Sequence, residues 1–308
     1  MNVENDRAIE HELKQHGYTI ILTISDTPSS KHIEVTKGKG FSFDAKIYKL
    51  KGNYRAMECY NNEKDILGSV IHPNIAETFD FFTSKNHAFL IFELCKDLSL
   101  ETLVSIPCSC TEKSIYGYIS QIIHGISHLH ANSIAHNNIN PSNIMFDRFG
   151  RIKIVDFDHS IFTNDQPLCS FTGTTRFPRA PESLNSKLYD PIAADIWGFG
   201  AVSYFLLSGE YPWSPELECS YSEAITNSIK KIYGKFDEKL IQLIVNCLSE
   251  NPTDRPSSAA IHSYLSNSAT LGPLSKKCIK KQSSNVTIPK IKRISSNTQF
   301  RIYSSSGK

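Results

Sequence analysis

A chain of 308 residues is long enough to bury a sizeable core in one large domain or in two lobes. It is 40% hydrophobic and 21% charged, as in ordinary globular proteins, and no apolar run approaches the roughly 20 residues of a membrane span. Of its eight cysteines none forms a Cys-x-x-Cys pair, and Cys108 and Cys110 are too close for the usual zinc spacing. We therefore expect reduced thiols and a cytoplasmic location, with the nucleus as an alternative.

The charge is unevenly distributed along the chain. Residues 268–308 hold nine Lys or Arg and no acid, and because the whole chain carries +2, residues 1–267 carry −7. A mildly acidic body with a basic, Ser-rich tail argues against a general nucleic-acid binder. We expect residues 266–308 to be a disordered tail. Alternatives are a target for basophilic kinases, a nuclear localisation signal, or a segment that binds an acidic partner.

The first part of the chain predicts strands and the later part predicts helices. A short helix is expected at residues 4–16, ending at Gly17, and a second, strongly amphipathic helix at residues 112–132. A further helix is expected at 98–105, and strands at 18–24, 31–35, 41–48, 75–82 and 87–92. The histidines of the amphipathic helix (His124, His128 and His130) are interpreted as surface or packing residues, because their pattern alone does not specify a metal site.

The most informative stretch is residues 134–158, which read IAHNNINPSNIMFDRFGRIKIVDFD. It resembles the catalytic core of a protein kinase, which has a His-Arg-Asp loop, an Asn five residues after that Asp, and a strand that ends in Asp-Phe-Gly. Here the loop is HNN, with Asn138 at the catalytic Asp position, and the strand ends in DFD. The resemblance implies ATP and Mg²⁺ as ligands, with Asn143 and Asp156 at the two magnesium-binding positions.

Other motifs of the family follow in the same order over residues 18–265. Ala180-Pro-Glu182 would close the activation segment, Arg255 would pair with its Glu182, and Asp195 would hold the catalytic-loop backbone. The resemblance implies an α+β, two-lobed protein kinase fold. A small β-rich N-lobe would span residues 18–93, a larger helical C-lobe residues 96–265, and an N-terminal extension residues 1–17. The loop pattern is closer to Ser/Thr kinases, and the calcium/calmodulin-dependent group is one candidate within them.

The phosphate-binding lysine has two possible registers. In the first, Lys46 lies on the third strand and pairs with Glu63 on the first large helix. In the second, Gly38-Lys-Gly40 is the glycine loop and the lysine has become Glu58. Spacing favours the first, because Glu63 follows Glu58 by only five residues, which leaves no room for the helix.

The nucleotide cleft departs from the family pattern. In the favoured register residues 25–30 form a turn without glycine, which makes a poor phosphate cradle. Asp44 brings a carboxylate toward the adenine position. The resemblance also places Glu93 and Cys95 at the hinge that binds adenine, and Met145 beneath the base.

Two substitutions fall on the positions that carry the chemistry. Asn138 replaces the catalytic Asp, and Asn140 replaces the Lys that stabilises the transferring phosphoryl group. An amide cannot accept a proton at neutral pH, and loss of a positioned base costs about 10²–10⁴-fold in rate. In addition, Asn137 replaces the Arg that binds a phosphorylated activation loop, and Asp158 replaces the Gly of Asp-Phe-Gly.

Three functions remain open from these observations. The first is a catalytically impaired pseudokinase that acts in signalling as a nucleotide-sensitive scaffold or allosteric partner of another protein. The second is a divergent Ser/Thr kinase that still transfers the γ-phosphate of ATP to a protein substrate. The third is an interaction scaffold that binds no nucleotide.

Overall fold

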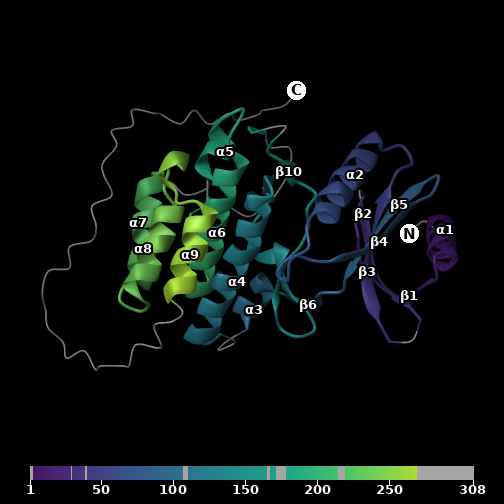
Figure 1. Ribbon diagram of the computed structural model, residues 1–308, viewed down its shortest axis with the longest axis horizontal. Coiled ribbons are helices and arrows are strands. Elements are labelled where there is room, and N and C mark those ends of the chain that lie inside the picture. Colours follow the sequence, from purple (N-terminus) through teal and green to yellow (C-terminus); the bar gives the residue numbers. More distant parts are fainter. Residues whose placement is uncertain are drawn as a thin grey trace, which may run out of the picture. The chain divides into compact units, whose positions relative to one another are not determined.

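The computed structural model describes residues 3–28, 30–38, 40–106, 110–164, 167–170, 178–213 and 219–268. A β-sheet with two helices forms the N-terminal lobe, and a group of helices forms the C-terminal lobe, so the α+β two-lobed fold is confirmed (Figure 1). The strands of the large sheet run antiparallel in the order β1-β2-β3-β5-β4. They are β1 (Tyr18–Asp26), β2 (Ser30–Lys37), β3 (Ser42–Lys49), β4 (Thr78–Thr83) and β5 (His87–Glu93).

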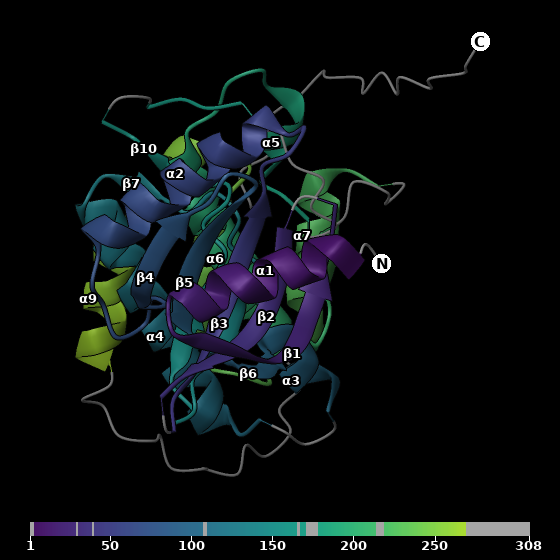
Figure 2. The ribbon, with the colours of Figure 1, turned by 90° about the vertical axis from the view of Figure 1, so that its right-hand side faces the viewer.

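Helix α1 (Val3–Gln15) lies across one face of this sheet (Figure 2). Its fully buried Ile9 and Leu13 pack on the side chains that alternate strand residues present to that face. Its polar residues are also bound, because Glu12 contacts buried His87 at 2.8 Å and Asp6 pairs with Lys31 at 2.5 Å. The helix expected at residues 4–16 is therefore present, and it is an integral layer of the N-lobe.

The opposite face of the sheet carries α2 (Tyr54–Ser69) and the polar side chains of β3. Strand alternation explains the division: Ala45 and Ile47 pack in the core beneath α1, so Lys46 and Tyr48 face the other way. The turn between β1 and β2 is short and is closed by the amide of Thr27, which donates to the carbonyl of Ser30 at 2.9 Å.

The C-lobe is built around α6 (Pro191–Ser208), which is buried along most of its length. Among the described helices it alone has the length and composition that could cross a membrane, but 72% of it is buried inside the protein, as in a core helix. The other helices are α3 (Leu100–Ser105), α4 (Glu112–Ala131), α5 (Pro181–Asn185), α7 (Tyr221–Ile232), α8 (Glu238–Cys247) and α9 (Ser258–Ser268). Two 3₁₀ turns are η1 (Pro141–Asn143) and η2 (Pro252–Asp254).

Short strands position the loops at the lobe boundary. One small sheet joins β6 (Lys96–Ser99), β8 (Ile144–Phe146) and β9 (Ile152–Ile154), and another joins β7 (Ile134–Ala135) to β10 (Ile161–Phe162). The catalytic-type loop follows β7 and the DFD motif follows β9. Several boundaries differ from expectation: β4 begins at Thr78 and α3 at Leu100, and β1 and β2 each end two residues later than expected. Among the described residues the cysteines form no disulfide with one another, whereas Cys108 and the tail from residue 269 lie outside the described residues.

Candidate functional site

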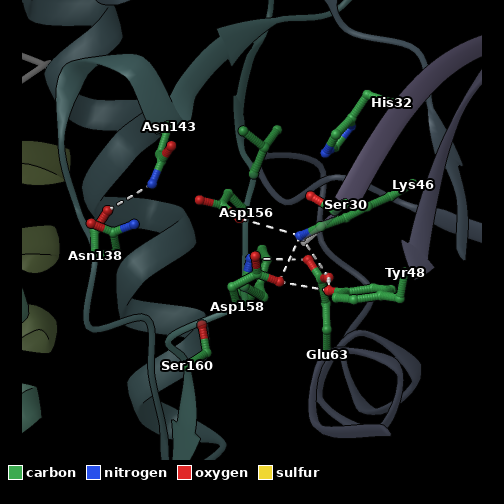
Figure 3. A network of polar contacts seen from close by, with 12 residues as sticks. Ser30, His32, Lys46, Tyr48, Glu63, Asn138, Asn143, Asp156, Asp158 and Ser160 are labelled. Atoms are coloured by element: carbon green, nitrogen blue, oxygen red, sulfur yellow. Dashed lines mark hydrogen bonds and ion pairs between the residues drawn. The ribbon is translucent and has the colours of Figure 1, made fainter. Parts of the chain in front are cut away.

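Lys46 and Glu63 form a buried ion pair at the boundary of the two lobes. The Lys46 Nζ lies 2.9 Å from the Glu63 Oε2, and the two side chains are 3% and 1% exposed. Asp156 approaches the same ammonium group at 3.3 Å (Figure 3). The expected pairing of Lys46 with Glu63 is confirmed. The competing register is wrong, because Glu58 lies within α2 and not on a strand.

Of the three carboxylates around Lys46, Asp158 makes the shortest contact with its ammonium group. Its Oδ1 lies 2.6 Å from the Lys46 Nζ and accepts a hydrogen bond from the Tyr48 hydroxyl at 2.6 Å. The same hydroxyl also contacts the Glu63 carboxylate. An ammonium group has three N–H donors, and here Glu63, Asp156 and Asp158 each accept one. The donors of Lys46 that would bind nucleotide phosphate are therefore all used within the protein.

The protonation of the cluster follows from burial and from the single cation. Burial alone would lower the pKa of Lys46, but Glu63 and the other surrounding groups outweigh it and raise this pKa well above 10.5. Burial raises the pKa of Glu63 to about 7 against the attraction of Lys46. Burial opposes ionisation of Asp158 as well, but Lys46 and Tyr48 overcome it and lower the pKa of Asp158 to about 2. Asp158 is therefore ionised at neutral pH and pairs with Lys46 as an anion.

The catalytic-type loop is occupied by amides that bind one another. The Asn140 Nδ2 donates to the backbone oxygen of Asn138 at 3.0 Å and to its side-chain oxygen at 3.1 Å. The Asn140 Oδ1 accepts hydrogen bonds from the amides of Ser142 and Asn143, the second and third residues of η1. The Asn143 Nδ2 donates to the same Asn138 carbonyl at 3.0 Å. Asn140 is thereby a capping residue of the loop, and it presents no cation to a transferring phosphoryl group.

Asp195, at the start of α6, holds this loop in place. Its carboxylate, 1% exposed, accepts hydrogen bonds from the amides of His136 and Asn137, both at 2.7 Å. The expected role of Asp195 is therefore confirmed. Asn137 adopts φ +62°, in the left-handed region that Asn tolerates better than most residues. The loop keeps a kinase-like backbone anchor although its catalytic side chains have changed.

Neutral and ionic contacts anchor both ends of the activation segment. The Asn137 Oδ1 accepts a hydrogen bond from the Tyr189 hydroxyl at 2.8 Å, and its Nδ2 donates to the His159 carbonyl at 3.2 Å. A neutral amide thus binds this segment where an Arg would need a phosphate. The Glu182–Arg255 pair is confirmed, with Nη–Oε distances of 2.6 and 2.8 Å.

The adenine end of the cleft is polar. His32 on β2 lies 3.0 Å from the Asp44 carboxylate on β3, so Asp44 is paired within the sheet. In the hinge, Glu93 pairs with buried Lys153 at 2.6 Å, and Cys95 is buried. Met145 lies on β8 opposite Lys153 of β9 and is partly buried. Adenine contact by Glu93, Cys95 and Met145 stays a prediction.

The residues present do not fit Mg·ATP as they are arranged. Lys46 has no free donor, the β1–β2 turn has no glycine, and Lys49 ties that turn down through Asp26 at 2.5 Å and the Thr27 carbonyl at 2.6 Å. In the described part of the chain one group of acids, Glu63, Asp156 and Asp158, brings its oxygens within 4.8 Å of one another, as a cation requires. The ammonium of Lys46 contacts all three and fills that role.

Sequence reasoning missed Tyr48, His32 and Tyr189, and it left open what Asp158 does. Tyr48 follows Lys46 by two residues, so strand alternation could have placed it in the cleft. His32 pairs directly with Lys46 in the β2–β3 register, which the turn at residues 36–40 sets. Tyr189 carries no local signal, because its partner Asn137 is 52 residues away.

Comparison with known proteins agrees with this geometry. The protein kinase domain family matches residues 32–265. Sperm motility kinase 2A of Mus musculus is 30% identical over 201 residues, covering 65% of this chain and 40% of that protein. Serine/threonine-protein kinase RUNKEL of Arabidopsis thaliana is 29% identical over 203 residues, covering 63% and 14%. The chain thus spans less than half the length of these relatives. It belongs to the eukaryotic protein kinase superfamily.

Proposed function

We propose that this chain is a pseudokinase: a kinase-fold protein that does not transfer phosphate and that acts in signalling by binding a protein partner. The observation that carries the proposal is the hydrogen bonding of Asn138 and Asn140 to each other in the catalytic-type loop. One position lacks a base and the other lacks a cation. Backbone anchors and buried ion pairs of the fold are retained, as a binding scaffold requires.

The magnitudes support loss of catalysis. Absence of a positioned base costs about 10²–10⁴-fold in rate. Absence of the cation removes part of the electrostatic stabilisation of the transition state, which is often the largest catalytic contribution. Both losses act on one transition state and need not multiply, but either leaves a slow enzyme.

Asp158 supports a nucleotide-free resting state. Its carboxylate binds Lys46 at 2.6 Å, where a phosphate oxygen of ATP would have to bind. Together with the Lys46–Glu63 pair, this contact links β3, α2 and the DFD segment without a ligand. We call the Lys46–Asp158 pair the carboxylate latch. ATP would have to displace the latch before it could act as a switch.

Transfer of labelled phosphate from ATP to generic protein substrates and to the chain itself tests the loss of catalysis. Wild type is expected to give no incorporation above the background of Asp156→Ala. The double variant Asn138→Asp/Asn140→Lys is expected to give little or none, because the β1–β2 turn and the latch are unchanged. ATP-dependent transfer by pure wild type would refute the proposal.

Thermal unfolding with and without ATP and Mg²⁺ tests the latch. Wild type is expected to show no ATP-dependent rise, whereas Asp158→Gly, which frees a donor of Lys46, is expected to show one. A ligand at a hundredfold excess over its Kd stabilises by about 2.7 kcal/mol. Lys46→Ala/Asp158→Gly is the matched control and should lose the rise. An equal rise in wild type and in Asp158→Gly would refute the latch.

A slow Ser/Thr kinase is the second candidate. Retention of Asn143 and Asp156 at the magnesium-binding positions favours it, because the two residues lie close together: the Asn143 carbonyl accepts a hydrogen bond from the amide of Val155, the residue before Asp156 (Figure 3). Its signature would be low incorporation that disappears in Asp156→Ala. We further propose a cytoplasmic or nuclear location and an acidic partner for the basic tail, on the charge distribution alone.

A further inference from the structure

We propose that two neighbouring turns form a docking surface for an acidic peptide segment of a partner protein, in which a carboxylate lies beside an apolar side chain. The residues of this docking surface are Phe41, Arg148, Phe149 and Arg151. Phe41 comes directly before β3 in the N-lobe, and the other three lie in the turn that joins β8 to β9. The inference rests on the proposed function only in that it assigns a surface to the protein partner.

The first argument is that guanidinium groups and phenyl rings alternate on this surface. The Arg148 Cζ lies 4.8 Å from the centre of the Phe149 ring and 5.7 Å from the centre of the Phe41 ring. The Arg151 Cζ lies 5.2 Å from the same Phe149 ring. These distances are within the roughly 6 Å range of a cation–π contact. The rings of Phe41 and Phe149 are nevertheless 56% and 68% exposed, so most of their apolar surface is open to a partner.

The second argument is the charge of the docking surface. Asp147 is the only acid of the β8–β9 turn, and it is fully buried and accepts a hydrogen bond from the Arg151 Nε at 2.6 Å. Within the described ranges Arg148 contacts the two rings and pairs with no carboxylate. A planar guanidinium binds a carboxylate through two parallel hydrogen bonds, and stacking on a ring leaves its N–H edge open. Arg148 is therefore placed to bind an anionic group between two apolar rings.

The third argument is that hydrogen bonds fix both turns before a partner binds. The Asp147 Oδ1 accepts the amides of Phe149 and Arg151, both at 2.8 Å. In the N-lobe, the Thr36 hydroxyl donates to the Phe41 carbonyl at 3.0 Å. A surface that is already ordered loses less conformational entropy on binding. Phe and Arg are also enriched at protein–protein interfaces, which suits this composition to a protein segment.

The charge of the chain favours a peptide over two other anionic or flexible occupants. Residues 268–308 carry +9 and the whole chain carries +2, so residues 1–267 carry −7. That body repels a polyanion such as single-stranded nucleic acid, whereas a peptide needs only one or two carboxylates at Arg148 and Arg151. The basic tail of this chain would bring Lys and Arg toward the two guanidinium groups, which like charge disfavours.

Selection from a random peptide library displayed on phage, with the full-length chain as bait, tests the proposal. We expect enriched peptides in which Asp or Glu adjoins an aromatic or aliphatic residue. The most enriched peptide, made with a fluorescein label, would then be titrated by fluorescence anisotropy. Its binding is expected to weaken by at least about tenfold in Arg148→Gln and in Phe149→Ala. Arg148→Lys should weaken it as well, because Lys keeps the charge but lacks the planar guanidinium.

Matched controls separate the docking surface from general charge or apolar binding. Arg7→Gln on α1 and Phe81→Ala on β4 remove an exposed Arg and an exposed Phe elsewhere and should leave the affinity unchanged. The same peptide with Asn or Gln in place of its acids should bind at least about tenfold more weakly. Because Arg148 and Phe149 are exposed, their substitution removes no buried contact, and circular dichroism would verify the fold.

Three outcomes would overturn the proposal. They are enrichment of peptides without acids, unchanged affinity in Arg148→Gln, and tighter binding of a single-stranded oligothymidylate than of the peptide at the same residues. The selection needs no ATP, so it is distinguishable from a failure of the proposed function. Phosphate transfer by wild type would refute the loss of catalysis and leave the docking surface standing.

Discussion

Glu182 and Arg255 form a buried ion pair whose loss should be costly. The guanidinium donates to both Glu182 oxygens, at 2.6 and 2.8 Å, and the two side chains are 11% and 1% exposed. In Glu182→Gln the guanidinium keeps its bonds to the carbonyls of Ala193 and Ser249 but loses its only counter-charge among the described residues. Removal of one partner of a buried pair destabilises by about 3–5 kcal/mol. That is a large share of the roughly 5–15 kcal/mol that holds a typical domain folded.

Urea unfolding followed by circular dichroism measures this free energy. We expect the midpoint of Glu182→Gln to fall by on the order of 1 M or more, because the slope is about 1–3 kcal/mol per M for small proteins. Glu210→Gln is the matched control, since Glu210 pairs with Lys231 on the surface, where the two side chains are 59% and 56% exposed. Exposed pairs contribute about 0–1 kcal/mol, so its midpoint should hardly move. A Glu182→Gln midpoint within the range of the control would refute the reasoning.

Three further outcomes are expected. Burial lowers the pKa of His136, so below about pH 6.5 the unfolded chain binds a proton that the folded chain does not. The free energy of unfolding, measured in urea, should therefore fall more steeply from pH 7 to pH 5 in wild type than in His136→Gln. Equal dependence on pH in the two proteins would contradict this. Gly198→Ala should lower the free energy of unfolding by about 1–3 kcal/mol, because the new Cβ would lie 2.9 Å from the Ile139 carbonyl oxygen. An unchanged Tm would contradict this and show that the loop containing Ile139 moves to accommodate the methyl group. Leu13→Ala should lower the free energy of unfolding by about 2–5 kcal/mol, since Leu13 is fully buried between α1 and the sheet. An unchanged urea midpoint would show that the packing of α1 does not stabilise the fold.

Several features of the site followed from local pattern. The resemblance to protein kinases implied a Lys–Glu pair, and spacing selected Lys46 and Glu63 for it, because the 17 residues that separate them leave room for a loop and most of a helix. The absence of glycine at residues 25–30 predicted an ordinary turn, and the amide of Thr27 closes it. The Asp195 anchor and the Glu182–Arg255 pair also matched their expected roles, since they come from motifs with fixed positions in the fold.

Other features could not be predicted, because their partners are distant in sequence. The sequence left the role of Asp158 open until the fold placed it 2.6 Å from Lys46, 112 residues away. The sequence predicted that the Asp44 carboxylate points toward the adenine position. It could not predict the pairing of Asp44 with His32, because that contact depends on the β2–β3 register.

By itself the sequence determined which chemical groups occupy the catalytic positions, because an Asn at position 138 lacks a basic carboxylate in any fold. It also determined the fold class, through the order and spacing of its motifs. Only the tertiary structure decided which carboxylates share the single ammonium of Lys46, and which histidines of α4 meet one from α9. These contacts depend on side-chain direction and on the packing of elements far apart in the chain, and local pattern specifies neither.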